Sequence, residues 1–313
     1  MGKLYSVGEA LIDFIALEKG SELKDVPTFE KVPGGAPANV AVAVAKLGGR
    51  SSLITKLGND AFGDFLLDVL KQNQMETDKV LRTSEAKTAL AFVSVMEDGE
   101  RDFSFYRNPS ADMLLLEQEI QEDWFSEGDI LHFCSVDLVE SPMKHANKKA
   151  IEGMKKRGGL VSFDPNIRLS LWNDYAACRR TVRSVLPYAH LEKVSDEELE
   201  FITGISQERD AIHSLFKGNY TKDMCFPSSG YPVEVADTNG AGDAFIGALL
   251  FKLLESGVRP NELVSFLKAK YDEVLTFANA SGALTASVQG AIPALPTKSQ
   301  VEQFLSERKI LEV

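Results

Sequence analysis

Hydrophobic residues along the 313-residue chain gather in short runs that alternate with longer stretches of helical periodicity. The short runs predict β-strands, and the longer stretches predict amphipathic or buried helices. The predicted strands are Leu4–Phe14, Ser52–Leu57, Thr88–Val95, Arg101–Tyr106, Asp129–Cys134, Leu160–Phe163 and Leu191–Val194. Helices predicted between or after them include Pro142–Arg157, Arg209–Phe216 and Asn261–Ala286. This alternation predicts an α/β fold of one large domain or two smaller ones.

A loop followed by a buried helix is predicted over Val235–Leu250, which reads V-A-D-T-N-G-A-G-D-A-F-I-G-A-L-L. The stretch after Asp243 is apolar on nearly every side, which is typical of a buried helix. The N-terminus of such a helix presents unpaired backbone N–H groups and the positive end of the helix dipole, and both favour an anion. Gly240 and Gly242 leave room for a phosphate beside those amides.

Asp243 is the unexpected residue in this first turn, because a carboxylate repels a phosphate. It has a chemical role if it accepts a proton from a hydroxyl that attacks the phosphate. An N-terminal capping Asp beside packing glycines is the simpler interpretation.

A second glycine-containing segment, Pro33-Gly34-Gly35-Ala36-Pro37-Ala38-Asn39, leads into a helix of small residues that runs to Leu47. Its two glycines allow backbone amides to approach a ligand closely, and Asn39 offers both a donor and an acceptor to a hydroxyl. Asp13 stands at the far end of the first predicted strand, where ligands of open α/β sheets bind. An ordinary solvated carboxylate is the alternative for Asp13.

These two segments resemble the signatures of the ribokinase-like (PfkB) carbohydrate kinases, P-G-G-A-P-A-N-V-A at residues 33–41 and D-T-x-G-A-G-D at residues 237–243. The segment R-D-F-S-F-Y-R-N-P-S-A-D at residues 101–112 is most similar to the fructokinases of that family. The resemblance implies a single ribokinase-like α/β domain over residues 1–313. It implies a mainly parallel central sheet flanked by helices, with a small β-sheet lid formed by approximately residues 15–33 and 88–107.

The activity implied by the resemblance is ATP-dependent phosphorylation of the primary hydroxyl of a hexose, with D-fructose as the leading substrate and fructose 6-phosphate as the product. Asp243 then acts as the general base, and the backbone amides of Gly240, Ala241 and Gly242 form an anion hole. Arg168 is a candidate for stabilising developing charge, and a salt bridge to Asp164 is its structural alternative. The implied sugar-binding residues are Asp13, Gly34, Gly35, Asn39, Phe103, Arg107, Asn166 and Asp243.

Two of the sugar-binding candidates lie in the predicted hairpin. Arg107 can bond sugar oxygens through the fork of its guanidinium, and Phe103 can pack on the apolar face of a sugar. A solvated hairpin with a structural Arg is the alternative.

Nucleotide and metal sites are implied by the same resemblance. The implied ATP-binding residues are Lys193, Gly240, Gly242, Asn279 and Ala283. Glu198 is implied to act on Mg²⁺ through water, although Ser195 stands where the family has Asn. Ser195 as N-cap with Glu198 three residues later also predicts a capping box, and both roles can hold together. Asp237 and Gly290 are implied contributors to a K⁺ site.

The largest departure from the family pattern is Lys217–Glu234, K-G-N-Y-T-K-D-M-C-F-P-S-S-G-Y-P-V-E. The resemblance predicts a central strand, a turn over the nucleotide and a returning strand here. Because strands average about five to six residues, these elements do not fit comfortably into this length. Either residues are missing from this sequence, or the deletion is genuine and affects nucleotide binding.

Charge and cysteine content narrow the classes of partner and compartment. With 34 Lys and Arg against 46 Asp and Glu, the net charge of −12 argues against a nucleic-acid partner or an anionic membrane surface. Cys134, Cys178 and Cys225 have no C-x-x-C spacing, which predicts reduced thiols in a cytoplasmic protein. No run approaches the ~20 apolar residues of a membrane span. A homodimer formed through the lid is implied by the resemblance.

Two alternatives to a fructokinase stay open. A 2-keto-3-deoxygluconate kinase shares the fold, and Arg101, Arg107 and Arg168 can supply the cations that its carboxylate substrate requires. A non-catalytic sugar-binding paralogue is favoured by the short segment after residue 216 and opposed by the intact Asp243 with its glycines.

Overall fold

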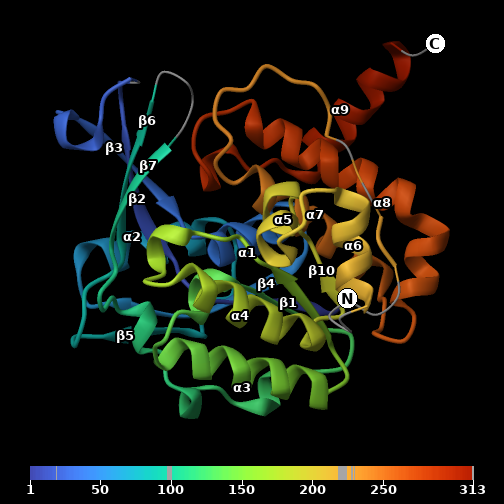
Figure 1. Cartoon of the computed structure of the whole chain (residues 1–313), viewed down its shortest axis with the longest axis horizontal. Helices are drawn as coiled ribbons and strands as arrows, with labels where there is room; N and C mark the ends of the chain where they lie inside the picture. The colour runs from blue at the N-terminus through green and yellow to red at the C-terminus, as the bar shows by residue number, and fades with distance from the viewer. Residues whose placement is uncertain (19, 97–100, 218–223, 227, 229, 312–313) are drawn as a thin grey trace.

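The computed structural model describes residues 1–313 except 19, 97–100, 218–223, 227, 229 and 312–313. In this part of the chain a larger and a smaller β-sheet lie at an angle to each other, and helices cover both faces of the larger sheet (Figure 1). The α/β fold expected from the alternation of strands and helices is therefore confirmed.

The central sheet has six parallel strands in the order β10-β9-β8-β1-β4-β5. These strands are β1 (Lys3–Val7), β4 (Arg50–Gly58), β5 (Val80–Thr83), β8 (Ile130–Cys134), β9 (Leu160–Asp164) and β10 (Leu191–Glu192). Strand β1 pairs with β4 on one side and with β8 on the other. All five of its residues are buried, as expected for a strand with helices on both faces of its sheet.

Helices pack on the two faces according to the alternation of side chains along the strands. Leu4 packs on one face with the core of α1 (Ala36–Lys46), α7 (Ala241–Ser256), α8 (Leu263–Ala286) and α9 (Lys298–Leu311). Tyr5 and Val7 pack on the other face with α3 (Pro142–Lys156), α4 (Tyr175–Val185), α5 (Asp196–Thr203) and α6 (Glu208–Lys217). Helix α2 (Ala61–Gln72) joins the core on the α1 side.

The small sheet has the strand order β3-β2-β6-β7. Its strands are β2 (Leu11–Ala16), β3 (Phe29–Gly34), β6 (Leu90–Val95) and β7 (Arg101–Tyr106). Strands β6 and β7 pair antiparallel, so the predicted hairpin is confirmed in its strands, and its predicted turn at residues 97–100 lies outside the described residues. The inner face of this sheet carries Leu11, Asp13, Phe103 and Phe105, which line the pocket described below.

One prediction about the strands was wrong. The apolar run Leu4–Phe14 is not a single strand, because β1 ends at Val7 and β2 begins at Leu11 in the other sheet. Gly8 has a φ of +148°, and a Cβ there would lie 2.0 Å from Oδ2 of Asp137. The chain therefore turns at a glycine that no larger residue can replace, and Asp13 lies within β2 rather than at the end of a central strand.

The short segment Lys217–Glu234 lies partly outside the described residues. Lys217 ends α6, and from Met224 onwards the described residues of this segment form no strand. Strand β10 is thus an edge of the central sheet in the part of the chain that the structure describes. None of the described helices combines the length and the apolar character that crossing a membrane requires.

Candidate active site

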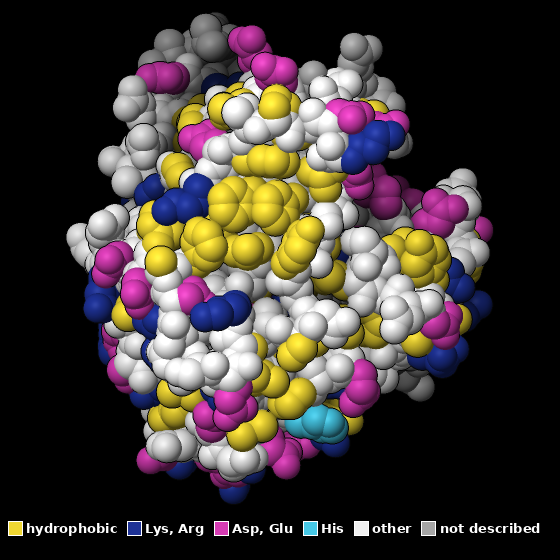
Figure 2. Space-filling model, turned by 90° about the vertical axis from the view of Figure 1, so that its left-hand side faces the viewer, with side chains coloured by type: hydrophobic (Ala, Val, Ile, Leu, Met, Phe, Trp, Pro, Cys, Tyr) yellow, Lys and Arg dark blue, Asp and Glu magenta, His cyan; other side chains and the backbone are white. Residues whose placement is uncertain are grey.

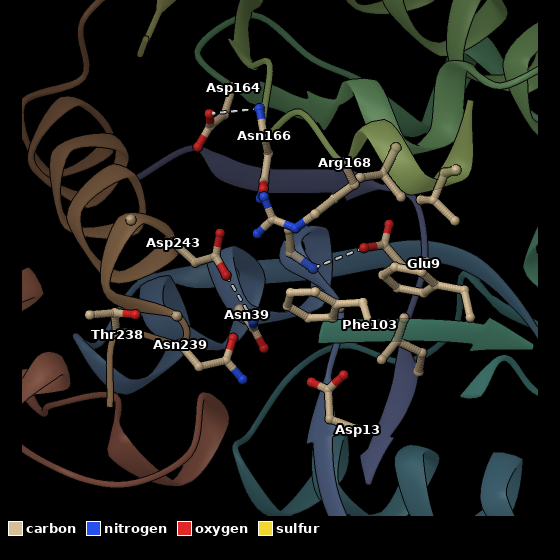
Figure 3. Close-up of a pocket in the computed structure, with 18 of the residues that line it drawn as sticks. Glu9, Asp13, Asn39, Phe103, Asp164, Asn166, Arg168, Thr238, Asn239 and Asp243 are labelled. Carbon is tan, nitrogen blue, oxygen red and sulfur yellow. Dashed lines mark hydrogen bonds between the residues drawn. The ribbon is translucent and has the colours of Figure 1, made fainter. Parts of the chain in front are cut away.

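A pocket lies between the carboxyl ends of the central strands and the inner face of the small sheet (Figure 3). It brings together twelve of the residues predicted from the sequence: Asp13, Gly35, Asn39, Phe103, Arg107, Asn166, Arg168, Lys193, Glu198, Gly240, Gly242 and Asp243. Gly34 adjoins the pocket beside Asp13, and Ala241 lies between the two glycines of the α7 terminus. The predicted residues Asp237, Asn279, Ala283 and Gly290 are not among the residues that line this pocket.

Asp243 is buried in the first turn of α7, where only 7 % of its surface is exposed. Nδ2 of Asn39 donates a hydrogen bond to its Oδ2 over 2.8 Å (Figure 3). Burial raises the pKa of Asp243, whereas the hydrogen bond from Asn39 and the positive charges of Lys193 and Arg168 lower it. The result is a carboxylate that is more basic than an exposed Asp and is held in one orientation, which suits a proton acceptor.

The two glycines at the N-terminus of α7 have different surroundings. Gly240 precedes the helix with a φ of +76°, and a Cβ there would lie 3.1 Å from Cα and Cβ of Ala291. At Gly242 a Cβ would lie 3.4 Å from Nζ of Lys193, so the ammonium group of Lys193 stands beside the helix terminus. The backbone N–H of Ala241 makes a long hydrogen bond of 3.4 Å to the carbonyl oxygen of Thr238. The helix dipole and the ammonium group together favour an anion such as a phosphate at this terminus.

Lys193 also neutralises a buried carboxylate. Its Nζ lies 3.2 Å from Oδ2 of Asp164, which is 1 % exposed. Burial raises the pKa of Asp164 to about 7; Lys193 opposes this rise, and the negative charges of Glu198 and Asp243 add to it. The salt bridge to Asp164 that was the structural alternative for Arg168 is therefore made by Lys193. Nη1 of Arg168 donates instead to the carbonyl oxygen of Ile167. Arg168 is exposed and lines the pocket.

Glu198 has the predicted capping-box geometry. The backbone N–H of Glu198 donates to Oγ of Ser195 over 3.3 Å, and Oε2 of Glu198 accepts from the backbone N–H of Ser195 over 2.9 Å. Oε1 of Glu198 accepts a further bond from the backbone N–H of Ile167 over 3.0 Å. These bonds fix the carboxylate at the wall of the pocket and leave lone pairs on both oxygens.

On the small-sheet side, Asp13 and the glycine pair lie close together. A Cβ at Gly34 would lie 2.2 Å from Oδ2 of Asp13, and Gly35 has a φ of +104°. Phe103 stacks on Phe105 with ring centroids 5.7 Å apart and presents an aromatic face to the pocket. A carboxylate, open backbone and an aromatic surface are groups that can hold a sugar by its hydroxyls and its apolar face.

Arg107 lines the pocket, but its guanidinium is largely engaged by the protein. Its Nε and Nη2 donate to Oδ2 of Asp112 over 2.8 and 2.5 Å, and Nη2 also donates to Oδ1 of Asp137 over 2.6 Å. Its Nη1 donates to the carbonyl oxygen of Val136 over 3.2 Å. The fork predicted for sugar oxygens is therefore occupied by Asp112, and one N–H of Nη1 remains. Asp112 is five residues away in the same segment, whereas Asp137 is 30 residues away after β8 and could not be recognised from the sequence.

Glu9 is a pocket residue that the sequence analysis missed. It is 3 % exposed, lines the pocket, and accepts a hydrogen bond at Oε1 from the backbone N–H of Ala36 over 3.0 Å (Figure 3). A carboxylate inside an otherwise apolar run was the available signal, since Glu is rarely buried without a specific partner.

The residues implied for potassium and for the nucleotide base lie outside the pocket. Oδ2 of Asp237 accepts from the backbone N–H of Gly290 over 3.1 Å, so these two candidates are neighbours. Asn279 and Ala283 lie one helical turn apart on α8, and Nδ2 of Asn279 donates to Oγ of Ser228 over 2.5 Å.

Comparison with known proteins supports the same family. Residues 1–298 match the model described as pfkB family carbohydrate kinase. The chain is similar to the protein named probable fructokinase-4 from Arabidopsis thaliana, with 43% identity over 318 residues and coverage of 96% of both chains. An alignment of 318 positions is longer than this 313-residue chain, so the relative has residues with no counterpart here.

Two solved structures are also similar. One is a fructokinase with bound ATP from Xylella fastidiosa, with a TM-score of 0.87, 35% identity and coverage of 98% of this chain and 99% of that one. The other is a fructokinase from Vibrio cholerae O395 in a fructose, ADP and calcium ion bound form, with a TM-score of 0.85, 33% identity and coverage of 97% and 99%. The family predicted from the two signatures is thus confirmed: this chain belongs to the pfkB family of carbohydrate kinases and has its ribokinase-like α/β fold.

Proposed function

We propose that this protein transfers the γ-phosphoryl group of ATP to the primary hydroxyl of D-fructose and forms fructose 6-phosphate. The observation that carries the proposal is the buried Asp243, oriented by Asn39, at the glycine-lined N-terminus of α7. A carboxylate beside an anion site has no structural need to be there, whereas a phosphotransferase needs both groups at one place. The fructokinase names of the similar proteins, one of them solved with fructose and ADP, support fructose as the sugar.

The sugar is proposed to lie against the inner face of the small sheet. Asp13, Asn39 and Asn166 offer acceptors and donors to its hydroxyls, and Gly34 and Gly35 let it approach the backbone. Phe103 packs on its apolar face, and the remaining N–H of Arg107 reaches toward it. The small sheet, over approximately residues 15–33 and 88–107, is proposed to act as a lid of a single domain that spans residues 1–313. Closure would exclude water, which otherwise competes for the phosphoryl group.

The phosphoryl group is proposed to pass beside the N-terminus of α7. Asp243 accepts the proton of the primary hydroxyl as the hydroxyl oxygen bonds to the γ-phosphorus and the bond to ADP breaks. The amides of Gly240, Ala241 and Gly242 neutralise charge on the transferring group, aided by Lys193 and Arg168. Asn279 and Ala283 of α8 are proposed to contact the nucleotide.

The metal ions proposed are Mg²⁺ and K⁺. Glu198 fits a magnesium ion held through water, because its two oxygens are oriented by backbone N–H groups and keep free lone pairs. Magnesium would supply positive charge to the phosphates of ATP. Asp237 and Gly290 are proposed to border a potassium site, since they are neighbours and the loop between α6 and α7 leads from Asp237 into the anion site.

A homodimer formed through the outer face of the small sheet is proposed as the assembly. Figure 2 shows hydrophobic side chains gathered on the side of the molecule that holds this sheet. Phe92 is in ring contact with Phe14, Phe29 and Tyr106, and Tyr106 is 64% exposed. Light scattering should give twice the chain mass for the wild type and the single-chain mass for Tyr106→Glu. A wild type that stays monomeric at all concentrations rules out this assembly.

A cytoplasmic location is proposed on cysteine usage. Cys134, Cys178 and Cys225 all carry free thiols, and reduced cysteines are typical of the cytoplasm. No nucleic-acid or membrane partner is proposed, in keeping with the acidic net charge.

Release of ADP from Mg-ATP tests the activity, with fructose, glucose, ribose, adenosine and 2-keto-3-deoxygluconate as acceptors and with or without K⁺. Rapid turnover with fructose above all others supports the proposal. A preference for 2-keto-3-deoxygluconate would mean that the protein is a kinase of this keto acid, with the same phosphoryl-transfer reaction. Sugar binding without ADP release from any acceptor overturns the proposal in favour of a non-catalytic sugar-binding protein.

A further inference from the structure

Three buried carboxyl groups surround one buried guanidinium at the sugar side of the pocket. Glu9, Asp112 and Asp137 are exposed by 3, 1 and 2 %, and Arg107 by 7 %. One positive charge cannot neutralise three negative charges in a site that excludes water, and each uncompensated buried charge is costly. The cluster therefore needs a second source of neutralisation.

Asp112 and Arg107 form an ion pair within this cluster. Nε and Nη2 of Arg107 both donate to Oδ2 of Asp112, and Oδ1 of Asp112 accepts from Oγ of Ser110. Each oxygen of Asp112 is thus satisfied by a donor of this chain. The excess negative charge falls on the other two carboxyl groups.

Glu9 and Asp137 each have one satisfied and one unsatisfied oxygen. Oε1 of Glu9 accepts from the backbone N–H of Ala36, and Oδ1 of Asp137 accepts from Nη2 of Arg107. Oε2 of Glu9 and Oδ2 of Asp137 are buried and receive no N–H or hydroxyl bond from the described residues. The two carboxyl groups are within hydrogen-bond contact of each other, which requires a proton on one of them.

The surroundings of Glu9 favour its protonated form. Burial and the negative charge of Asp137 raise the pKa of Glu9 well above its ordinary value, and Arg107 opposes this only in part. Burial also raises the pKa of Asp137, although Arg107 and the hydrogen bond from Glu9 lower it. Cys134, at the end of β8, interacts electrostatically with Glu9, and burial raises the pKa of its thiol and keeps it neutral.

We infer that Glu9 and Asp137 share one proton and that this carboxyl pair positions the sugar side of the pocket. Through Oε1 of Glu9 it holds the turn at Gly35 and Ala36, and through Oδ1 of Asp137 it holds the guanidinium of Arg107. Gly35 packs so closely on the connection between β1 and β2 that a Cβ there would lie 2.6 Å from the carbonyl oxygen of Glu9. Glu9 lies in the connection between β1 and β2, and Asp137 lies in the short 3-10 turn Ser135–Leu138 after β8. The pair therefore links these two connections with the start of α1 and with Arg107, which follows β7, at one point beside the sugar.

The inference rests on the proposed function only where sugar affinity is the readout. A shared proton can be tested with amide substitutions. One amide can replace the protonated carboxyl group as the donor, but two amides cannot replace both carboxyl groups, because the site needs one donor and one acceptor. Glu9→Gln or Asp137→Asn places one N–H donor between two acceptors and keeps the outer hydrogen bonds. The double variant places two donors against each other, and turning either amide over moves the conflict to the N–H of Ala36 or to Arg107.

The experiment is a double-variant cycle on the full chain, read by the KM for fructose, by kcat and by thermal unfolding without substrates. We expect each single variant to keep the KM within about threefold and the double variant to raise it about tenfold beyond the product of the two single effects, equivalent to ~1.4 kcal/mol of coupling. The kcat at saturating fructose should change less than the KM, since the pair positions the sugar and does not touch the reacting atoms. The matched control is the same pair of changes on the surface, Glu85→Gln with Asp68→Asn, whose effects should be additive.

The pH profile gives a second readout. The KM for fructose of the wild type should rise at alkaline pH as the shared proton leaves, and Glu9→Gln should suppress this rise. Additive effects of Glu9→Gln and Asp137→Asn, or a Glu9→Gln variant as impaired as Glu9→Ala, overturn the inference. A double variant that fails to fold while both single variants fold supports it. A wild type that does not phosphorylate fructose overturns the proposed function alone, because the unfolding cycle still tests the shared proton.

Discussion

Asn39 and Asp243 are 204 positions apart in the sequence, and Nδ2 of Asn39 donates to Oδ2 of Asp243 over 2.8 Å. The bond joins the first turn of α1 to the first turn of α7. These helices are in close contact, because a Cβ at Gly247 of α7 would lie 2.6 Å from Cβ of Ala43 in α1. Small residues in both helices thus determine how the two signature segments meet.

Substitution of the proposed general base tests the mechanism most directly. We expect Asp243→Asn to lower kcat by about 100-fold or more, because an amide cannot accept the hydroxyl proton. The fold and the affinity for fructose should remain, since the Oδ1 of the new amide can accept the bond from Asn39. Steady-state kinetics and calorimetric fructose binding measure the two effects. Wild-type turnover in this variant would remove Asp243 from the mechanism.

The hydrogen bond from Asn39 should influence the pH dependence of the reaction. It lowers the pKa of Asp243, and Asp243 must be ionised to accept a proton. In Asn39→Leu the pKa of Asp243 rises, so the acidic limb of kcat against pH should move to higher pH by about one unit, given ~1.5 kcal/mol for a hydrogen bond to a charged group.

A matched control for that variant is Asn59→Leu, which removes an exposed hydrogen bond to Ser84. Its acidic limb should coincide with that of the wild type. An acidic limb that also stays in place in Asn39→Leu would mean that another group controls it.

The sequence predicted the residues that line the active site better than the residues that hold them in position. The glycine pair, Asn39 and the α7 terminus are local features, because the backbone conformation and the helix end that make them lie within a few residues. Arg107 pairs with Asp137, which is 30 positions away, and the role of Glu9 depends on the turn of the chain at Gly8. Contacts between separate elements leave no local signal, so these required the structure.

The central sheet was likewise predictable where its strands are long and apolar. The run Leu4–Phe14 was misjudged because periodicity does not show that the chain leaves one sheet for another at Gly8. The capping box of Ser195 and Glu198 was recognised because it is a motif of four residues. Tertiary packing, by contrast, decides that Lys193 rather than Arg168 pairs with Asp164.

Loss of the charge at Lys193 should affect ATP more than sugar. Its Nζ stands between Asp164 and the terminus of α7, so Lys193→Met removes a cation from the anion site. We expect kcat/KM for ATP to fall by about 100-fold, in the range seen when one electrostatic group is removed from an active site. The KM for fructose should change by much less.

The variant Lys252→Met is the matched control, because Lys252 pairs with Glu255 and Glu273 away from the pocket. It should leave kcat/KM for ATP unchanged. If Lys193→Met raises the KM for fructose and ATP equally, the ammonium group acts through the folding of the site and not at the phosphate.

The two glycines that flank α7 provide a test of the anion site with an internal control. Gly240 and Gly257 have φ values of +76° and +65°, so Ala at either position adopts a strained backbone that costs about 1 kcal/mol. The space around them differs: a Cβ at Gly240 meets Ala291 at 3.1 Å, whereas a Cβ at Gly257 meets nothing within 4 Å.

Both variants should therefore unfold at a lower temperature, by roughly 2–4 °C for the shared strain. Only Gly240→Ala should also lose turnover, because relief of its contact with Ala291 moves the amides that face the phosphoryl group. Thermal unfolding and kcat measured on the same samples separate the two effects. Equal losses of kcat in Gly240→Ala and Gly257→Ala would show that strain anywhere in α7 is sufficient, and the amides at its N-terminus would lose their specific role.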